Sequence, residues 1–317
     1  MAKFGLRIEP YTEKQIREHI HLLYLTAAER IVFELDAIMS VPDAIETIEA
    51  MHDNAVLEEL IPELYMGLGV KQPSSHHLDV FEHGIAALKH METVQKDPGA
   101  YFPGQGELFR EYLQRDRRRI LLKWAALFHD LGKPETHAIR EDRNGRITFY
   151  NHDQEGSRIF DIIAARFKWR RDDRDFVSRL ISIHMWPFHL NNARKKTGLT
   201  PRAYLRLIKT TEEEYPGLFM LAMADSLAGC GAGKPPGMEE DIANLFYDVE
   251  TVYRETIRPV LTKRLLTGND LIAVFGLAPG PAFREIFDCL ESAQVEGKVQ
   301  DKDQALLWVK NYLKLHK

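Results

Sequence analysis

The stretch ILLKWAALFHDLGKP, from Ile120 to Pro134, decides the fold class that this sequence predicts. Its apolar residues occupy almost every face of the predicted helix. Lys123 is the one charged residue before the adjacent pair His129 and Asp130. Such a helix is typical of a protein interior. Because an unpaired carboxylate is costly to bury, the pair indicates either a divalent metal site or a histidine and an aspartate satisfied by hydrogen bonds.

The residues after this pair predict where the helix ends. We expect Gly132 to end the helix in the left-handed conformation and Pro134 to block its continuation. A histidine and an aspartate at a helix end can open toward a cleft, where their side chains remain accessible to a ligand.

Composition excludes several classes of protein. The 317 residues can bury a substantial core, and a formal net charge of -5 gives no overall basic signature for nucleic-acid binding. Two cysteines, Cys230 and Cys289, support neither a disulfide framework nor a cysteine zinc site. No apolar run approaches the roughly 20 residues needed to span a bilayer. We therefore expect a cytoplasmic protein without a membrane partner.

Four more polar residues lie on apolar helices or at their ends. The first, His83, follows Asp79 by four residues, close enough for that carboxylate to orient the imidazole. The others are His152 in the first turn of a helix capped by Asn151, His184 on the apolar stripe of Phe176 and Leu180, and Asp225, the one charge in the apolar run 218–228. Taken singly, each of these residues also fits a hydrogen-bonded core residue.

Together, four histidines and two aspartates form a candidate ligand set: His83, His129, Asp130, His152, His184 and Asp225. Imidazole suits Zn, Fe, Ni or Mn, carboxylate admits Mg and Mn, and the set contains no thiolate. Two ions bridged by one aspartate would use all six residues. We therefore expect one or two divalent metal ions (Mn, Mg, Ni, Fe or Zn).

The rest of the chain predicts an all-α protein. The Asn144-Gly145 turn between the segments 136–141 and 146–150 indicates one short β-hairpin. The Gly-rich stretch GCGAGKPPG, residues 229–237, lacks the spacing of a phosphate-binding loop and predicts a flexible linker. The basic residues Arg115, Arg117, Arg118 and Arg119 predict a solvated helix face.

Five stretches resemble, in chain order, the elements of HD-domain phosphohydrolases: VFEHGIAALKH, LFHDLGKP, FYNHDQEGSRI, LISIHMWPF and LAMADSLAG. The resemblance implies an HD-domain helical bundle. It also implies that one metal ion is held by His83, His129, Asp130 and Asp225, and a second by Asp130 with His152 and His184. Asp130 would be the catalytic bridge. Lys133 could contact a substrate phosphate as a point charge, or it could simply favour the helix dipole.

Nearly the whole chain resembles part of another family. FGLRIEPYTEKQIREH near the N-terminus and LLTGNDLIAVFGLAPGPAFREIF near the C-terminus are similar to the neck, body and tail of bacterial CCA-adding tRNA nucleotidyltransferases of the poly(A) polymerase family, in members that carry an HD domain. The resemblance implies a helical neck and body segment (1–70), an HD domain (71–237) and a helical tail resembling the tRNA-binding tail (238–317).

The nucleotidyltransferase head of that family has no counterpart in the sequence. No Gly-Ser-x-Asp-x-Asp pattern of paired metal-binding carboxylates occurs. We therefore expect no nucleotidyl transfer by this chain alone.

The sequence leaves two classes of function open. The first is a metal-dependent phosphohydrolase that acts on phosphomonoesters or 2',3'-cyclic phosphodiesters of nucleotides or RNA ends. The alternative is a binding protein, either an RNA-end or tRNA-end binding subunit that works with a separate nucleotidyltransferase head, or an HD domain that senses a ligand without turnover. A pure RNA binder does not need the full ligand set, so the six candidate ligands favour the enzyme.

Overall fold

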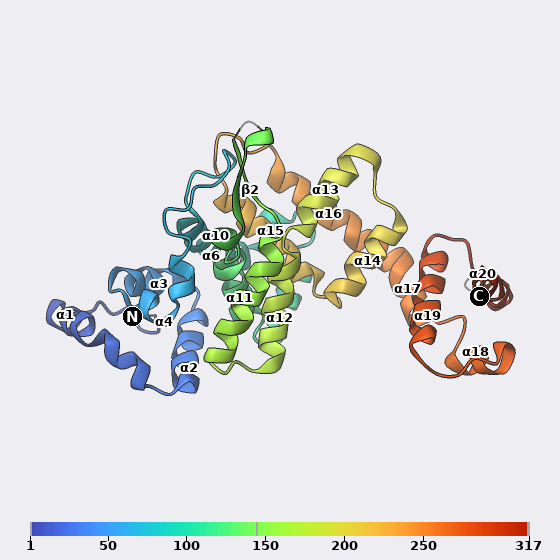
Figure 1. Cartoon of the computed structure of the whole chain (residues 1–317), viewed down its shortest axis with the longest axis horizontal. Coiled ribbons are helices and arrows are strands. Elements are labelled where there is room, and N and C mark those ends of the chain that lie inside the picture. The colour runs from blue at the N-terminus through green and yellow to red at the C-terminus, as the bar shows by residue number, and fades with distance from the viewer. Residues whose placement is uncertain (1, 144, 316–317) are drawn as a thin grey trace. The chain divides into compact units, whose positions relative to one another are not determined.

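Helices make up most of the computed structural model, which describes residues 2–143 and 145–315 (Figure 1). The prediction of an all-α protein is confirmed. Within the described residues, the one sheet is the antiparallel pair of β1 (His137–Arg140) and β2 (Arg146–Phe149). The predicted hairpin is therefore confirmed, and Asn144 of its turn lies outside the described residues.

The chain forms two compact units. The first contains the residues up to Asn191 together with Pro216–Asn244, and the second contains Asn192–Tyr215 together with the residues from Leu245 onward. None of the helices in the described part of the chain combines the length and the apolar composition needed to cross a membrane.

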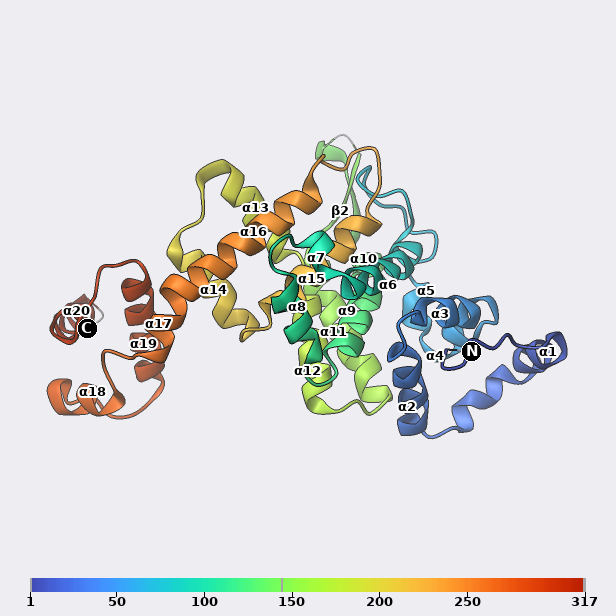
Figure 2. The same ribbon diagram turned by 180° about the vertical axis from the view of Figure 1, so that it is seen from behind.

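The first unit begins with a series of short N-terminal helices, labelled in Figure 2, and the helices on or beside which the candidate ligands lie come later in the chain. The short helices are α1 (Pro10–His19), the 3-10 helix η1 (Ile20–Leu25), α2 (Ala28–Met39), α3 (Ala44–Asp53), α4 (Val56–Leu60) and α5 (Pro62–Tyr65). They are followed by α6 (Val80–Lys96), α7 (Pro98–Tyr101), α8 (Gly106–Gln114), α9 (Arg118–Phe128), α10 (Lys133–Thr136), α11 (His152–Arg166), α12 (Arg171–Ile183), the start of α13 (Trp186–Thr197), α15 (Tyr215–Ala228) and the start of α16 (Met238–Val252).

Helix α9 is the core helix of the first unit. All residues of 121–128 are buried, and the helix packs against α2, α6, α8 and α12. The indole of Trp124 stacks on the ring of Phe128, with centroids 5.3 Å apart, and meets Trp169 edge-on at 5.6 Å. Burial on all sides explains why the apolar residues of this segment surround the helix instead of forming a stripe.

The end of α9 differs from the prediction. The helix ends at Phe128, and Gly132 has a right-handed backbone with φ -83°, so the predicted left-handed stop is wrong. Pro134 lies in the first turn of α10. The glycine is required by packing, because a Cβ atom at Gly132 would lie 2.2 Å from the carbonyl oxygen of His152 and 2.4 Å from the amide nitrogen of Gly156 in α11.

The one charge inside α9 belongs to a buried ion pair. Lys123 Nζ lies 2.7 Å from Glu92 Oε1 on α6 and also donates to the carbonyl oxygen of Val41. Glu92 Oε1 accepts the backbone N–H of Ala44 at 2.7 Å, at the first residue of α3. This pair therefore joins the short N-terminal helices to the helices that carry the candidate ligands.

A second charged contact holds α2 in place. Arg117 lies 2.6 Å from Asp36 Oδ2 and, through Nε, 2.9 Å from Asp173 Oδ2, while Asp36 Oδ1 accepts the indole N–H of Trp124 at 3.1 Å. The prediction of a solvated basic face is thus wrong for Arg117, which connects α2, α9 and α12.

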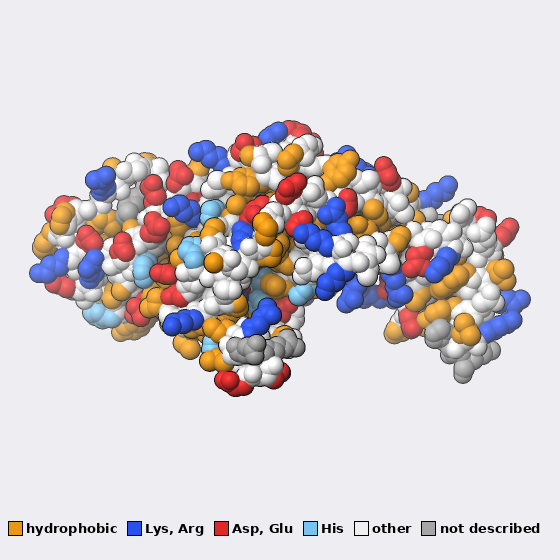
Figure 3. All heavy atoms as spheres, turned by 90° about the horizontal axis from the view of Figure 1, so that it is seen from above, with side chains coloured by type: hydrophobic (Ala, Val, Ile, Leu, Met, Phe, Trp, Pro, Cys, Tyr) orange, Lys and Arg blue, Asp and Glu red, His pale blue; other side chains and the backbone are white. Residues whose placement is uncertain are grey.

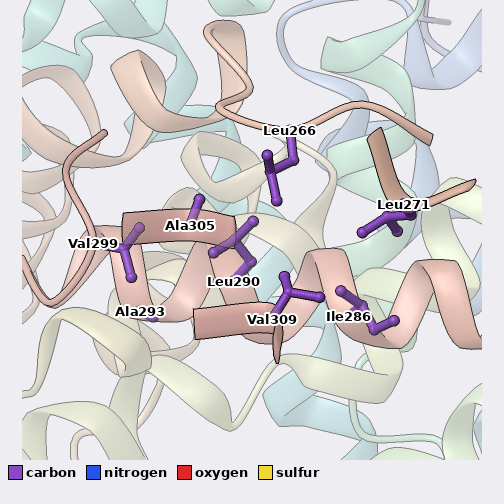
Figure 4. Packing of buried hydrophobic residues seen from close by; sticks show 8 residues of the cluster. All are labelled: Leu266, Leu271, Ile286, Leu290, Ala293, Val299, Ala305 and Val309. Carbon is purple, nitrogen blue, oxygen red and sulfur yellow. The ribbon is translucent and has the colours of Figure 1, made fainter. Parts of the chain in front are cut away.

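The second unit has its own hydrophobic core. It contains α14 (Pro201–Thr211), the π-helical turn η3 (Tyr253–Ile257), α17 (Arg258–Thr262), α18 (Gly268–Phe275), α19 (Pro281–Val295) and α20 (Lys302–Leu315). Figure 4 shows the buried side chains of its core cluster, which are Leu266, Leu271, Ile286, Leu290, Ala293, Val299, Ala305 and Val309. The cluster draws on α18, α19 and α20, so these three helices stabilise one another.

Removal of the Glu92 carboxylate should destabilise the first unit strongly. In Glu92→Ala the buried Lys123 ammonium loses its anionic partner, so we expect the free energy of unfolding to fall by about 3 to 5 kcal/mol. Urea denaturation followed by circular dichroism measures this loss. The matched control is Glu46→Ala, which removes an exposed carboxylate from α3. Equal stability of the two variants would contradict the role assigned to the pair.

An added methyl group at Gly132 should also destabilise the protein. Because its Cβ would overlap backbone atoms of α11, Gly132→Ala should lower the free energy of unfolding by about 1 to 3 kcal/mol. Gly99→Ala is the matched control in the same unit, since a Cβ there would meet its nearest atom at 3.5 Å, an ordinary contact. If both variants melt at the wild-type temperature, the close packing at Gly132 is not a constraint on the fold.

Candidate metal centre

The first unit brings all six candidate ligands together. They are His83 in the first turns of α6, His129 and Asp130 directly after α9, His152 at the first residue of α11, His184 directly after α12, and Asp225 in α15. All are buried except Asp225, whose side chain is 12% exposed. Residues that are up to 142 positions apart in the sequence thus lie around one point.

Asp79 does not orient His83. Asp79 is the N-cap of α6, where its two oxygens accept the backbone N–H groups of Glu82 at 2.8 Å and Gly69 at 2.6 Å. His83 Nε2 lies instead 3.0 Å from Asp225 Oδ1. The prediction for Asp79 is wrong because helix capping and the preceding turn occupy its carboxylate.

The two oxygens of the Asp130 carboxylate face two groups of histidines. Oδ2 lies 3.1 Å from His129 Nε2 and 3.5 Å from His83 Nε2. Oδ1 lies 3.4 Å from His152 Nε2 and 3.7 Å from His184 Nε2. Asp130 is therefore the residue common to both groups.

Asp225 completes the first of these groups. Its Oδ1 lies 3.0 Å from His83 Nε2 and 3.6 Å from His129 Nε2. The first group thus combines two imidazoles and two carboxylates, whereas the second combines two imidazoles with Asp130.

Backbone carbonyl groups fix the tautomers of three histidines. The Nδ1 atoms of His129, His152 and His184 lie 2.9, 2.7 and 2.7 Å from the carbonyl oxygen three residues earlier in the chain. A carbonyl oxygen can only accept, so each Nδ1 carries the hydrogen. In the neutral rings, each Nε2 then presents its lone pair toward Asp130.

This donor set fits a divalent metal ion. Nε2 of His152 lies 3.1 Å from Nε2 of His184, so two lone pairs face each other beside a carboxylate. Among the described residues, the buried Asp130 Oδ1 has no hydrogen-bond partner. A cation that accepts electron pairs from imidazole and carboxylate would satisfy these atoms together.

The second group of histidines is neutral at pH 7. Burial lowers the pKa of His152, and it lowers the pKa of His184 to about 3. Burial likewise lowers the pKa of His83 in the first group. Neutral imidazole is the form that binds a metal ion.

The first group also contains opposite charges. Burial acts to raise the pKa values of Asp130 and Asp225, but nearby positive charges and hydrogen bonds, with the charge of His129 the largest of them, together outweigh burial and hold both pKa values well below their usual range. Burial acts to lower the pKa of His129, and the two carboxylates outweigh it and raise that pKa to about 10. A metal ion at His129 would therefore displace a proton.

Lys133 lies against the same carboxylate. Its Nζ is 2.6 Å from Asp130 Oδ2 and 2.7 Å from Gln72 Oε1, and it sits 5.6 Å from the ring centroid of Phe149. The side chain is buried, with Lys133 6% exposed. Asp130 is the first anion beside this ammonium. The buried positive charge of Lys133 is also available to a second anion that binds at the site.

Sequence reasoning missed two residues, Gln72 and His76. The ring of His76 lies edge-on to that of His83, with centroids 4.8 Å apart, and burial lowers the pKa of His76 to about 4. His76 lies in the segment before α6, which begins at Val80. The crowding of histidines between His76 and His189 was the signal that could have included it.

Three family models match consecutive parts of the chain. A model described as "Probable RNA and SrmB-binding site of polymerase A" matches residues 5–66, an HD domain model matches 80–227, and a model of tRNA nucleotidyltransferase domain 2 matches 254–309. All six candidate ligands lie inside the HD match.

Curated relatives match over nearly the whole chain. The A-adding tRNA nucleotidyltransferase of Deinococcus radiodurans is 30% identical over 98% of this chain, and the CC-adding enzyme of Thermus thermophilus is 27% identical over 96%. The chain spans 66% and 62% of the lengths of these two relatives. The multifunctional CCA protein of Pseudomonas aeruginosa is 27% identical over 66% of this chain.

A solved structure supports the same fold. The CCA-adding enzyme in apo form I superposes with a TM-score of 0.50 and 14% identity, over 98% of this chain and 56% of that one. At this identity the likeness concerns the fold alone. Together with the matches above, it shows that the chain is an HD-domain protein homologous, over 98% of its length, to part of the tRNA nucleotidyltransferase family.

Proposed function

We propose that this chain is a metal-dependent phosphohydrolase that acts on phosphomonoesters or 2',3'-cyclic phosphodiesters of nucleotides or RNA ends. The observation that carries the proposal is the Asp130 carboxylate, whose two oxygens face two separate pairs of histidine Nε2 atoms. A carboxylate shared in this way suits a pair of divalent ions.

The residues divide between two ions. His83, His129, Asp130 and Asp225 would hold the first, and Asp130 with His152 and His184 would hold the second. Their four imidazoles favour Mn, Fe, Ni or Zn over Mg. When bound, such ions supply a nucleophile at neutral pH and stabilise the charge that develops on a phosphoryl group.

The chain's own side chains would prepare the site for that chemistry. The carbonyl groups at Nδ1 hold three imidazole rings in the orientation that faces Asp130. We assign to Lys133 the binding of a phosphate oxygen, because its ammonium is buried at the carboxylate and its charge would partly neutralise a phosphate. Gln72, at 2.7 Å from Lys133 Nζ, would keep that ammonium in position.

RNA ends are the substrate class favoured by the neighbouring parts of the chain. The HD match is flanked by the matches to an RNA-binding site model and a tRNA nucleotidyltransferase domain. Figure 3 shows acidic and basic side chains interspersed over the visible face, in keeping with the net charge of -5. RNA would therefore be recognised by local contacts rather than by the field of the whole protein.

The same flanking matches support a second candidate function. In it the chain is an RNA-end or tRNA-end binding subunit that works with a separate nucleotidyltransferase, and the HD domain binds a ligand without turnover. The two candidates differ in one observable property, which is metal-dependent hydrolysis by the isolated chain.

Substitution of the shared carboxylate should abolish hydrolysis. Wild type and Asp130→Asn are compared on 2',3'-cyclic AMP, 2'-AMP and p-nitrophenyl phosphate with Mn²⁺, Mg²⁺, Ni²⁺ or no metal. We expect wild-type turnover only with metal and a loss of about a thousandfold or more in kcat/KM for Asp130→Asn, because metal ions contribute several kcal/mol to transition-state stabilisation. Elemental analysis should show a matching loss of bound metal.

The matched control is Asp161→Asn, which makes the same change at an exposed position of α11 and should keep wild-type rates. Absence of turnover by wild type on all three substrates, together with binding to a tRNA, would favour the second candidate. Equal, metal-independent rates for wild type and Asp130→Asn would refute the metal-dependent mechanism.

Loss of the Lys133 charge should act on substrate binding. Lys133→Met keeps the buried aliphatic part of the side chain and removes the ammonium. If Lys133 binds phosphate equally in the ground and transition states, KM should rise about tenfold or more while kcat changes little. Lys96→Met, at an exposed position of α6, is the control. A fall in kcat at constant KM would instead place Lys133 in the chemical step.

A further inference from the structure

The Gly-rich segment after α15 is not a simple linker. The backbone N–H of Gly231 donates to the carbonyl oxygen of Ser75 at 2.9 Å, and that of Gly233 donates to the carbonyl oxygen of Ser74 at 2.8 Å. A Cβ atom at Gly231 would lie 2.3 Å from the Ser74 carbonyl oxygen. Glycine is therefore required here so that two backbone segments can lie directly against each other.

This contact determines the position of His76. The Gly-rich segment follows directly on α15, the helix that carries Asp225, and it binds the two residues that precede His76. A Cβ atom at Gly229 would lie 3.7 Å from His76 Cδ2, an ordinary contact distance. The backbone directly before His76 is thus held by hydrogen bonds, and Gly229 lies beside its ring.

The imidazole of His76 is oriented toward the metal centre. One ligand atom each from His76, His83 and Asp225 lies within 4.8 Å of the others. The Ser75 hydroxyl lies 3.0 Å from Nδ1 of His76, which leaves Nε2 as the nitrogen available to an ion. Unlike the buried ligands, His76 is partly exposed, so it lies at the rim of the centre.

We propose that His76 is a seventh ligand of the metal centre, on the side of His83 and Asp225, and that residues 229–233 act as a clamp that positions it. The inference rests on the metal site of the proposed function. A fifth imidazole would add to the preference of the first ion for Mn, Fe, Ni or Zn over Mg. It would also explain why a histidine next to the centre is oriented by a serine hydroxyl, in the way that other metal-binding histidines are oriented by their outer partners.

Metal binding itself tests the assignment without any substrate. The dissociation constant for Ni²⁺ is measured by competition with a chelator for wild type, His76→Gln and the matched control His21→Gln. His21 is an exposed histidine of η1 and belongs neither to the ligand set nor to residues 229–233. We expect His76→Gln to raise the dissociation constant about tenfold or more and His21→Gln to leave it near the wild-type value.

Co²⁺ distinguishes a ligand from a residue that only supports the fold. The visible absorption spectrum of bound Co²⁺ depends on the number and geometry of its ligands. His76→Gln should change this spectrum at full Co²⁺ occupancy, while its melting temperature without metal stays near that of wild type. An unchanged spectrum and an unchanged dissociation constant would overturn the assignment of His76.

Gly231→Ala tests the clamp. If the clamp acts through His76, this variant should weaken Ni²⁺ binding by a similar factor, and the double variant with His76→Gln should bind no more weakly than His76→Gln alone. If the two substitutions act independently, the factors by which they weaken Ni²⁺ binding multiply in the double variant. That result would overturn the positioning role of residues 229–233.

The outcomes separate this inference from the proposed function. If wild type binds no divalent metal, both fail. If wild type binds metal and His76→Gln is indistinguishable from it, only the role of His76 fails. If His76→Gln weakens metal binding and no phosphate ester is hydrolysed, the seventh ligand stands and the proposed hydrolase activity fails.

Discussion

The Asp130 carboxylate is the constraint on which the rest of the first unit depends. It is 3% exposed, at the end of a helix that is buried on all sides. A carboxylate in that position is stable only if positive charge and hydrogen-bond donors converge on it. Lys133 and the charged His129 provide these partners at Oδ2, whereas the Nε2 lone pairs of His152 and His184 leave Oδ1 without a donor and favour a cation beside it.

The ends of helices and strands orient the imidazoles of this arrangement. The last turn of a helix leaves carbonyl oxygens without helical partners, and those of Ala126 in α9 and Ile181 in α12 accept the Nδ1 hydrogens of His129 and His184. The short hairpin has the same role, because the carbonyl oxygen of Phe149 at the end of β2 accepts the Nδ1 hydrogen of His152. The one sheet of the described chain thus helps to orient His152, one of the candidate ligands.

The sequence predicted the all-α class, the hairpin and the six residues that converge, because each depends on residue type and local periodicity. A lone aspartate in an apolar helix such as α15 is unusual enough to be noticed without any tertiary information. Gly132 and Gly231 could not be interpreted in this way. Each is glycine because a segment distant in the sequence lies within 2.5 Å of where its Cβ would be. Such a tertiary contact cannot be predicted from the neighbouring residues in the sequence. The place of His76 depends on the same kind of contact.

These two glycines show how backbone contacts set the distances between the candidate metal ligands. Gly132 allows the turn that carries Asp130 to touch the backbone of His152, and Gly231 allows the segment after Asp225 to touch the backbone before His76. In both places, a backbone contact without side chains sets the separation between residues that would bind one ion. Backbone contacts vary less than contacts between long side chains, because they involve fewer rotatable bonds. A metal centre built from several helices therefore gains its geometry from glycine contacts outside the ligand set.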